Sequence, residues 1–458
     1  MDIRQILSEV PDYKSFFTMD EMDASSLRLA EEFPDVVKVF EIGRSRNNHP
    51  IRCLKIGNGS KNVLLFASPH PNEPIGSTML EFLTRKIAED EKLREGLDLT
   101  WYCIKSVDPD GTKLNEGWFK GPYNLFNYAR NFFRPAGFEQ VEWTFPFEYK
   151  TLKFDSPIPE TVALARLISE IKPIFMYSLH NAGFGGVYWY LSEDMPNVYP
   201  VLWDLVDELE LPLRLGEPET PYAQSLAKAV YKQSSTKNRY EYILKFQKKD
   251  PAEVIKSGGG SFDYVKEICD AFTLVCEAPY FFNMDISNLN DSDMLRSEAV
   301  LASCDIQEEF NRFCLQHVNR IEKYITPGNS LFTAVKAFSD MKSGNEAKRN
   351  WAKASPECQR QATVAEKFTN LYSTRFYSML SVGMLSRAAQ RELDKDPSAD
   401  AEKVRDLSEV RDLALEKVKE TSDFLEREID YQVVPIRKLV TIQLASGLYF
   451  LQELLKEH

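Results

Sequence analysis

Four short apolar runs, separated by stretches with helical spacing, constrain the fold of this chain more than any other feature. A strand with one face in water alternates apolar and polar residues, so a run that is apolar throughout predicts a strand covered on both faces. Strands that alternate with helices are typical of a parallel sheet with helices on its faces. The sequence therefore predicts an α/β fold with a mixed, largely parallel sheet flanked by helices. The four runs are Val63–Ala67, Thr100–Ile104, Ile174–Tyr177 and Phe272–Cys276.

Two of the intervening stretches, Gly76–Ala88 and Pro159–Ile171, predict helices. Pro159 suits the first turn of a helix, where its missing N–H has no helical partner to lose. Apolar residues recur after it at helical spacing and predict one apolar side of the helix. This side consists of Val162, Leu164, Leu167, Ile168 and Ile171.

The character of the chain changes after about residue 290, where strand signals fade. Charged residues surround an apolar stripe between 402 and 430, which predicts an amphipathic helix. The polar segment Ser339–Ser355 predicts a loop or linker, and Val434–Leu455 predicts a final helix that packs on other structure. The stripe comprises Val404, Leu407, Val410, Ala414, Val418, Thr421 and Leu425.

These changes predict three parts: an N-terminal helical segment (1–34), an α/β domain (35–325) and an additional α-helical C-terminal region (326–458). Three roles are open for the C-terminal helices. They could pack on the α/β domain, cover its binding cleft, or join two copies of the chain in a homo-oligomer.

Composition excludes several classes of protein. With 458 residues, 43% hydrophobic and 12% aromatic, the chain can build a large core. Lys and Arg number 56 against 69 Asp and Glu, so the net charge is −13 and neither nucleic acid nor an anionic membrane surface is an expected partner. No apolar run reaches the roughly 18 residues that a membrane span requires.

The seven cysteines are odd in number and scattered, without a Cys-x-x-Cys pair, so we expect neither a disulfide framework nor a cysteine zinc knuckle. The first residues lack the basic and apolar regions of a signal peptide. We therefore expect free thiols and a cytoplasmic location.

Histidines and carboxylates follow the ends of the predicted strands. His70 and Glu73 come just after the first strand, and His180 comes just after the third. Glu277 directly follows the last strand. Ligand sites in α/β sheets gather beyond the carboxyl ends of the strands. We therefore expect these side chains to meet at one edge of the sheet.

Two histidines and a glutamate, with water in the fourth position, are the ligands of a catalytic zinc site. The sequence therefore predicts one Zn²⁺ per chain, held by His70, Glu73 and His180. Zinc there would polarise a carbonyl and lower the pKa of its bound water, and Glu277 would accept the proton and pass it to the leaving amine. Taken singly, His180 could instead be a hydrogen-bonded core histidine and Glu277 a solvated carboxylate.

Several motifs stand in the order found in zinc metallocarboxypeptidases related to carboxypeptidase A, which the chain resembles over about residues 35–290. The resemblance implies a zinc carboxypeptidase-like catalytic domain with His70, Glu73 and His180 as zinc ligands and Glu277 as general base. The motifs are Gly43-Arg44-Ser45 with Ile51–Ile56, His70–Glu73, Val107–Gly111, Pro159–Thr161, Leu179-His180, and Gly259–Asp263 followed by Glu277.

The chain departs from the family pattern at its carboxylate and carbonyl contacts. The resemblance implies that Arg130 anchors the C-terminal carboxylate of a substrate, next to Asn131, although Ala129 replaces the family's amide. Phe119 stands where the family has an arginine that polarises the scissile carbonyl. Lys120, Arg134 or Arg46 could supply that positive charge.

The resemblance also bears on side-chain selection. Phe262 implies an apolar or aromatic pocket for the side chain of the substrate. The family's closing tyrosine aligns on Ile255, which leaves Tyr222, Tyr240 and Tyr242 as substitutes. The aromatic run at Tyr188–Tyr190 is either a wall of the cleft or part of the core.

These observations favour a zinc-dependent hydrolase that cleaves a C-terminal peptide bond, with a peptide or an amino-acid amide as its substrate. One alternative is a zinc amidohydrolase or deacylase that acts on a small N-acyl or modified amino acid. A further alternative is a non-catalytic zinc-binding scaffold in which the C-terminal helices carry the function.

Overall fold

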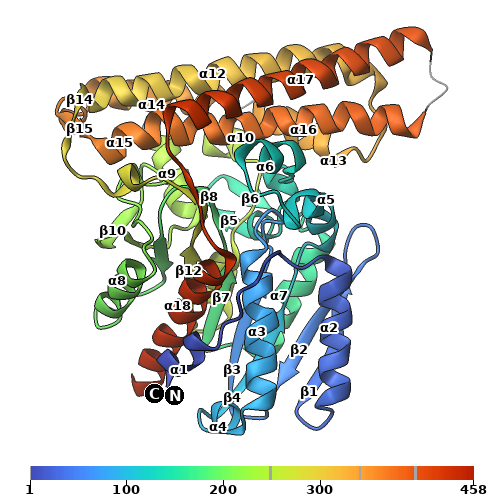
Figure 1. Cartoon of the computed structure of the whole chain (residues 1–458), viewed down its shortest axis with the longest axis vertical. Helices are drawn as coiled ribbons and strands as arrows, with labels where there is room; N and C mark the ends of the chain where they lie inside the picture. The colour runs from blue at the N-terminus through green and yellow to red at the C-terminus, as the bar shows by residue number, and fades with distance from the viewer. Residues whose placement is uncertain (1, 247–249, 340–341, 397–399, 458) are drawn as a thin grey trace.

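The computed structural model describes residues 2–246, 250–339, 342–396 and 400–457. Its centre is a mixed sheet of nine strands in the order β1-β2-β4-β3-β7-β12-β9-β11-β10 (Figure 1). The four predicted strands are the adjacent strands β4, β3, β7 and β12, which all run parallel. The strands are β1 Val37–Arg44, β2 Pro50–Ile56, β3 Lys61–Ala67, β4 Leu99–Ile104, β7 Phe175–Leu179, β9 Tyr188–Leu191, β10 Gln224–Ala227, β11 Val230–Lys232 and β12 Phe272–Glu277.

Helices cover both faces of this sheet, as the unbroken apolar strands predict. Along β3, Val63 and Leu65 face one apolar core, whereas Leu64 and Phe66 face the other. The first core is covered by α1 (Ile3–Ser8), α2 (Met19–Glu32), α3 (Ile75–Glu89), α8 (Tyr199–Glu208) and α18 (Ile436–Glu457). The second is covered by α7 (Pro159–Ile171) and α11 (Ser261–Ile268).

Helix α7 has the predicted bounds, but its predicted apolar side is wrong at one position. Leu164 and Ile168 are fully buried, whereas Val162 is 49% exposed. Each residue turns a helix by about 100°, so Val162 lies about 200° from Leu164 and points away from the sheet.

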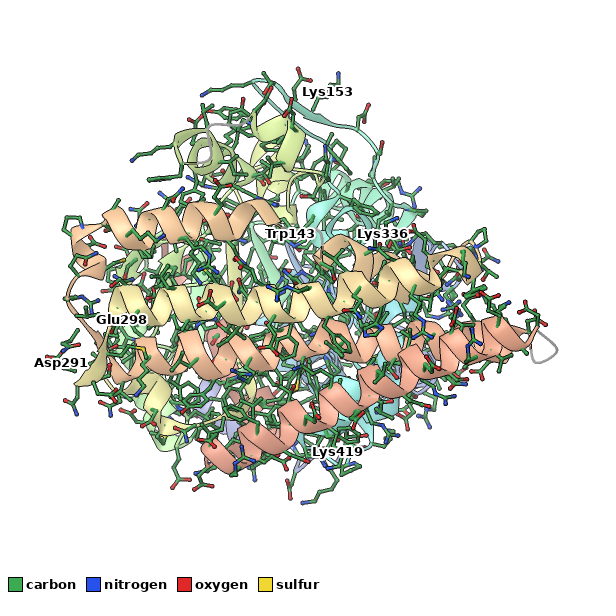
Figure 2. The ribbon with its side chains drawn as sticks, turned by 90° about the horizontal axis from the view of Figure 1, so that it is seen from above. Trp143, Lys153, Asp291, Glu298, Lys336 and Lys419 are labelled. Atoms are coloured by element: carbon green, nitrogen blue, oxygen red, sulfur yellow. The ribbon has the colours of Figure 1, made fainter. Side chains whose placement is uncertain are left out.

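The helices that follow β14 (Asp291–Leu295) form a layer across one end of the sheet (Figure 1). Figure 2 shows three of them side by side from above, with Glu298 on α12 and Lys419 on α17. Tyr377 of α16 joins the layer to β8 (Ala182–Phe184), a strand of a separate three-stranded sheet, because its hydroxyl accepts hydrogen bonds from the N–H groups of Gly183 at 3.0 Å and Phe184 at 3.2 Å. The layer comprises α12 Arg296–Ile321, α13 Ser330–Ser339, α14 Lys342–Ala354, α15 Val364–Phe368, α16 Thr374–Lys395 and α17 Ala401–Glu428.

Two predictions for this region have different outcomes. The stripe of α17 is buried from Leu407 to Leu425, with Val404 half-buried. The predicted loop at Ser339–Ser355 is wrong, because α14 occupies Lys342–Ala354; residues 340–341 lie outside the described ranges. Helix α14 buries mainly the small side chains of Ala347 and Ala352, which carry little hydrophobic signal. No helix in the described ranges is both long and apolar enough to cross a membrane.

After α17 the chain leaves this layer, and the last helix, α18, packs on the nine-stranded sheet (Figure 1). The side-chain amide of Gln443 donates a hydrogen bond to the carbonyl of His180, and Tyr177 donates to the carbonyl of Gln443 at 3.1 Å. Trp189 Nε1 donates to the hydroxyl of Ser446 at 2.8 Å. Helix α18 therefore packs as part of the α/β core, although it lies in the predicted C-terminal region. The predicted domain boundary at residue 325 stays a prediction.

Short elements connect these layers. The strands are β5 Phe147–Tyr149, β6 Leu152–Phe154, β8 Ala182–Phe184, β13 Pro279–Phe282, β15 Gln361–Thr363 and β16 Gln432–Val433. The helices are α4 Glu91–Glu95, α5 Pro109–Phe119, α6 Leu125–Asn131, α9 Thr236–Phe246 and α10 Pro251–Val254.

Asp108, which caps the N-terminus of α5, gives a prediction about stability. One of its oxygens accepts from the N–H of Gly111 at 2.9 Å, and the other has no hydrogen-bond partner among the described residues. Burial raises the pKa of Asp108 to about 7, although nearby Arg46 acts to lower it. The protonated form therefore favours the folded state at low pH, and this contribution is lost as the pH rises from about 4 to about 7.

We expect Asp108→Asn to gain stability over the wild type as the pH rises, by an amount on the order of 2 kcal/mol at pH 8. An amide keeps the acceptor for Gly111 and carries no charge to bury. Thermal unfolding of both proteins at pH 4.5 and pH 8 measures the difference. An equal effect of the substitution at both pH values would contradict the prediction.

Candidate metal centre

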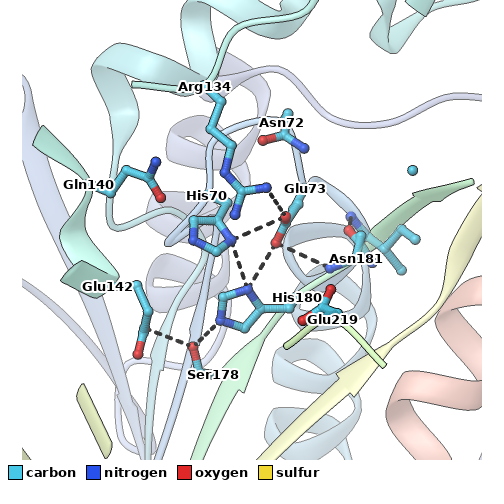
Figure 3. A network of polar contacts seen from close by, with 12 residues as sticks. His70, Asn72, Glu73, Arg134, Gln140, Glu142, Ser178, His180, Asn181 and Glu219 are labelled. Carbon is cyan, nitrogen blue, oxygen red and sulfur yellow. Dashed lines mark hydrogen bonds and ion pairs between the residues drawn. The ribbon is translucent and has the colours of Figure 1, made fainter. Parts of the chain in front are cut away.

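His70, Glu73 and His180 meet beyond the carboxyl ends of β3 and β7 (Figure 3). The two histidine Nδ1 atoms lie 3.0 Å apart. One oxygen of Glu73 lies 3.2 Å from Nδ1 of His70, and the other lies 3.0 Å from Nδ1 of His180. The structure therefore brings the three predicted ligands together.

The pairing of β3 with β7 explains this convergence. The strands are parallel neighbours, with Ala67 opposite Leu179, so both chains leave the sheet at the same level. Ser68 then adopts a left-handed backbone conformation with φ 53°, and the chain turns through His70 and Glu73 into α3. The sequence predicted these residues beyond the carboxyl ends of largely parallel strands, and the structure has them there.

The three side chains fit a zinc ion in both chemistry and spacing. Ligands placed about 2.0–2.1 Å from a tetrahedral zinc ion lie about 3.3 Å from one another, which is close to the separations of 3.0–3.2 Å found here. Two imidazole nitrogens and a carboxylate oxygen are common zinc ligands. All three residues are buried.

Glu73 and His70 are in the protonation states that a metal ligand needs. Burial acts to raise the pKa of Glu73, but His70, His180 and Arg134 outweigh it and hold that pKa well below its usual range. Glu73 is therefore ionised. Burial lowers the pKa of His70 to about 3, so its imidazole is neutral and has a lone pair available for a metal ion.

Glu277 is the last residue of β12, next to β7 in the sheet. Leu274 lies opposite Tyr177 in this parallel pair, and the same register carried three residues further sets Glu277 level with His180. Glu277 is 8% exposed, and its Oε2 has no hydrogen-bond partner among the described residues. Burial, followed by the charges of Glu73 and Glu219, raises the pKa of Glu277 well above its usual value.

A hydrogen-bonded chain behind His180 was not predicted from the sequence. Ser178 Oγ lies 2.9 Å from Nε2 of His180 and donates to a carboxylate oxygen of Glu142 at 3.3 Å (Figure 3). The Ser178 oxygen therefore accepts from Nε2–H, which directs Nδ1 of His180 toward His70 and Glu73. Glu142 also accepts from the N–H of Ser261 at 3.0 Å, so it joins the loop of three glycines at 258–260 to the centre.

We expect Ser178→Ala and Glu142→Gln each to weaken zinc binding about tenfold to a hundredfold, because the orientation and tautomer of His180 lose their support. Competition against a chelator of known affinity measures the zinc dissociation constant. Ser156→Ala, at an exposed position, is the matched control. Unchanged zinc affinity in both variants would contradict this role.

Arg130, Asn131 and Lys120, predicted to contact substrate, do not join the cluster. Helix α6 buries Leu125, Asn127, Tyr128 and Ala129, which leaves Arg130 exposed with its guanidinium 5.8 Å from the ring centre of Phe126. Asn131 donates to Asn127 on its own helix, at 3.0 Å. Lys120 pairs with Glu21 of α2 at 2.7 Å, because the N-terminal segment packs beside it.

The other predicted contacts lie in several places. Phe262 is buried at the start of α11, directly after Ser261, and its role as a pocket wall stays a prediction. Arg46 pairs with buried Glu160 at 3.3 Å, whereas Arg134 reaches Glu73 at 3.4 Å and is the guanidinium at the centre (Figure 3).

The candidate closing tyrosines lie in and beside α9. The hydroxyl of Tyr240 hydrogen-bonds to the hydroxyl of Thr151 at 2.7 Å, and the rings of Tyr222 and Tyr242 pack 5.5 Å apart. Ile255 is buried in the same small apolar cluster as Tyr240. These contacts join the tyrosines to Thr151 and to one another, and a closing role for any of them stays a prediction.

Comparison with known proteins assigns the chain to a family. Residues 22–290 match the family model described as zinc carboxypeptidase, which covers more than half of the chain. The protein therefore belongs to the zinc carboxypeptidase family, a family of zinc-dependent hydrolases. Zinc is the cofactor of this family, and the His70–Glu73–His180 cluster fits it.

Individual relatives are similar over smaller parts. Zinc carboxypeptidase A 1 of Anopheles gambiae is 29% identical over 118 residues, or 24% of this chain and 27% of that protein, so the match spans about a quarter of the relative's length. Carboxypeptidase A from Helicoverpa armigera shows 16% identity and a TM-score of 0.38, over 61% of this chain and 71% of that chain. A metallo-carboxypeptidase from Burkholderia cenocepacia shows 17% identity and a TM-score of 0.33, over 57% and 60%.

Proposed function

We propose that this protein is a zinc-dependent peptidase that removes residues from the C-terminus of a peptide. The observation that carries the proposal is the meeting of His70, Glu73 and His180 at one sheet edge, with Glu277 at the end of the next strand. Zinc held there would polarise the scissile carbonyl and lower the pKa of a water molecule.

In this proposal Glu277 is the general base and then the general acid. Its raised pKa suits a group that must both accept and release a proton near neutral pH. The free Oε2 of Glu277 is available to accept a proton, and burial keeps bulk water away from it. The same carboxyl then delivers the proton to the leaving amine.

Arg130 and Arg134 are the two candidates to bind oxygen atoms of the substrate. The family resemblance favours Arg130 as the anchor of the C-terminal carboxylate. Geometry favours Arg134, which already contacts Glu73 and sits next to the centre (Figure 3). We propose that Arg134 supplies the positive charge that the Phe119 position lacks.

One observation also favours the alternative of a small N-acyl or modified amino acid as substrate. His70, Glu73, His180 and Glu277 are 6%, 1%, 5% and 8% exposed, so little of the centre is open to a large ligand. The site residues and chemistry would be the same, and only the size of the substrate would differ.

For the location we propose the cytoplasm, in line with seven cysteines that are all free.

Mass spectrometry of a mixed pool of peptides and N-acyl amino acids tests these proposals. Each pool is incubated with the zinc-loaded protein, with and without a chelator. Chelator-sensitive loss of single C-terminal residues supports the peptidase, and cleavage confined to small acyl amides supports the alternative. No cleavage by protein that carries zinc would favour a non-catalytic scaffold. The same assay on Arg130→Gln and Arg134→Gln measures how much each arginine contributes to cleavage.

A further inference from the structure

A second polar cluster adjoins Glu277 on the sheet and has no part in the zinc site. Strand β9 pairs antiparallel with β12, with Tyr188 opposite Glu277 and Tyr190 opposite Val275. Side chains alternate between the faces of a strand, so both tyrosines lie on the face that carries Glu277. Trp189 points to the other face, where its Nε1 donates to Ser446.

Three donors in this cluster converge on the carboxylate of Glu219. The hydroxyl of Tyr188 donates to one oxygen at 2.5 Å, and the hydroxyl of Tyr190 donates to the other at 3.1 Å. Nη1 of Arg214 lies 3.6 Å from the first oxygen, and its guanidinium lies 4.8 Å from the ring centre of Tyr188. The charge of Glu219 acts on the pKa of Glu277, so these two carboxylates lie near each other.

The donors and the acceptor differ in how they are held. Tyr188 is 1% exposed, and the Arg214 side chain is 14% exposed, whereas the Glu219 side chain is 44% exposed. Tyr188 and Tyr190 lie on a strand of the sheet. The backbone N–H of Arg214 donates to the carbonyl of Val187 at 3.0 Å, and its Nη2 donates to the carbonyl of Glu217 at 3.3 Å.

The segment that carries Glu219 is held on both sides of it, by Glu217 before it and by the packing of Tyr222 on Tyr242 after it. The carboxylate of Glu217 accepts a bidentate pair of hydrogen bonds from Arg296 of α12, at 2.9 Å and 2.7 Å. Glu219 follows two residues later outside any helix or strand. An exposed loop carboxylate therefore contacts one buried and two half-buried donors, of which the tyrosines lie on a strand and Arg214 has bonds of its own to Val187 and Glu217.

We infer that Arg214, Tyr188 and Tyr190 form a subsite for a carboxylate group of the substrate, and that Glu219 occupies this subsite until the substrate displaces it. An arginine and two hydroxyl donors match the acceptors of a carboxylate. The strand pairing sets the subsite beside Glu277, and in this inference the bound carboxylate belongs to the residue that hydrolysis releases. This inference rests on the proposed hydrolase function and names the substrate class: an amino acid recognised through an anionic group.

Two sources of that carboxylate are distinguished by binding. The C-terminal α-carboxylate and an acidic side chain offer the same chemistry. Isothermal titration calorimetry of the full-length, zinc-loaded protein with N-acetylglutamate, N-acetylglutamine and the α-amide of N-acetylglutamate separates them. The second ligand keeps only the α-carboxylate, and the third keeps only the side-chain carboxylate.

Glu219→Gln is the deciding variant, because it removes the competing charge from an exposed position. We expect it to bind the preferred ligand at least tenfold more tightly than the wild type, and Arg214→Gln to bind it at least tenfold more weakly. Tyr188→Phe weakens binding in the same direction. Glu193→Gln, an exposed residue that follows β9, is the matched control for the change of charge.

Unchanged affinity in folded, zinc-loaded Glu219→Gln would overturn the inference. So would a result in which N-acetylglutamine and the α-amide of N-acetylglutamate bind no more tightly than the uncharged amide of an N-acetyl amino acid. Calorimetry requires no turnover. Binding that follows Glu219 and Arg214 without any hydrolysis would therefore support the subsite while the proposed function fails. Hydrolysis without any effect of Glu219 on binding would instead support the proposed function while the subsite fails.

Discussion

Replacing Glu277 with glutamine is expected to lower turnover by about 10³-fold to 10⁴-fold while zinc stays bound. An amide has the size of the carboxylate but cannot accept the proton of the attacking water. Glu277 is not part of the cluster of His70, Glu73 and His180, so the metal ligands remain intact. The kcat on the best substrate from the mixed pool, together with zinc content by elemental mass spectrometry, measures both effects.

Two variants make this result specific. Glu193→Gln changes the same functional group at an exposed position and should keep the kcat of the wild type. Glu73→Gln removes a predicted ligand, so it should lose zinc and activity together. Turnover by Glu277→Gln at the wild-type rate would show that another group is the base.

Removing α18 is expected to abolish folding of the whole chain. The helix buries large apolar side chains against the sheet and α3, each at 1% exposure or less: Leu439, Val440, Ile442, Leu444, Leu448, Phe450 and Leu451. Each such side chain contributes about 1.5–3 kcal/mol, so the seven together contribute about 10–21 kcal/mol, which is as large as or larger than a typical net stability of about 5–15 kcal/mol. A C-terminal region that was only an appendage could be removed without this cost.

A chain that ends at residue 434 tests this expectation by circular dichroism and thermal unfolding. We expect loss of the cooperative transition and aggregation, because the face of the sheet behind Tyr177 and Trp189 is uncovered. Leu448→Ala provides a graded control and should cost about 2–5 kcal/mol while the fold is kept. A shortened chain that keeps the wild-type melting temperature would refute this account.

The parts of the fold that followed from the sequence are those with a strong apolar signal. The central strands are unbroken apolar runs and α7 has apolar residues at helical spacing, and the side chains just beyond the parallel strands were then expected at one edge. Helix α14 has no such signal, because it buries the small side chains of Ala347 and Ala352. Sequence pattern therefore located the cluster of His70, Glu73 and His180 and missed a helix.

The polar surroundings of the centre were harder to predict. Glu142 reaches His180 through Ser178, although 38 positions (180 minus 142) separate Glu142 from His180 and no motif links the two. Arg130 stands in a recognisable motif, but whether its side chain points inward depends on how α6 packs. Arg134, which follows that helix, takes the position at Glu73.

The position of α18 also fixes when the metal centre can be completed during synthesis. His180 and Gln443 are separated by 263 residues. A ribosome that adds about 5–20 residues per second needs about 13–53 seconds to make that stretch. During this time α18 does not yet cover the strands β3 and β7, which precede the predicted zinc ligands. A nascent chain therefore carries every predicted catalytic group long before α18 covers the strands that position them, and we expect the proposed activity to begin only after α18 has been made.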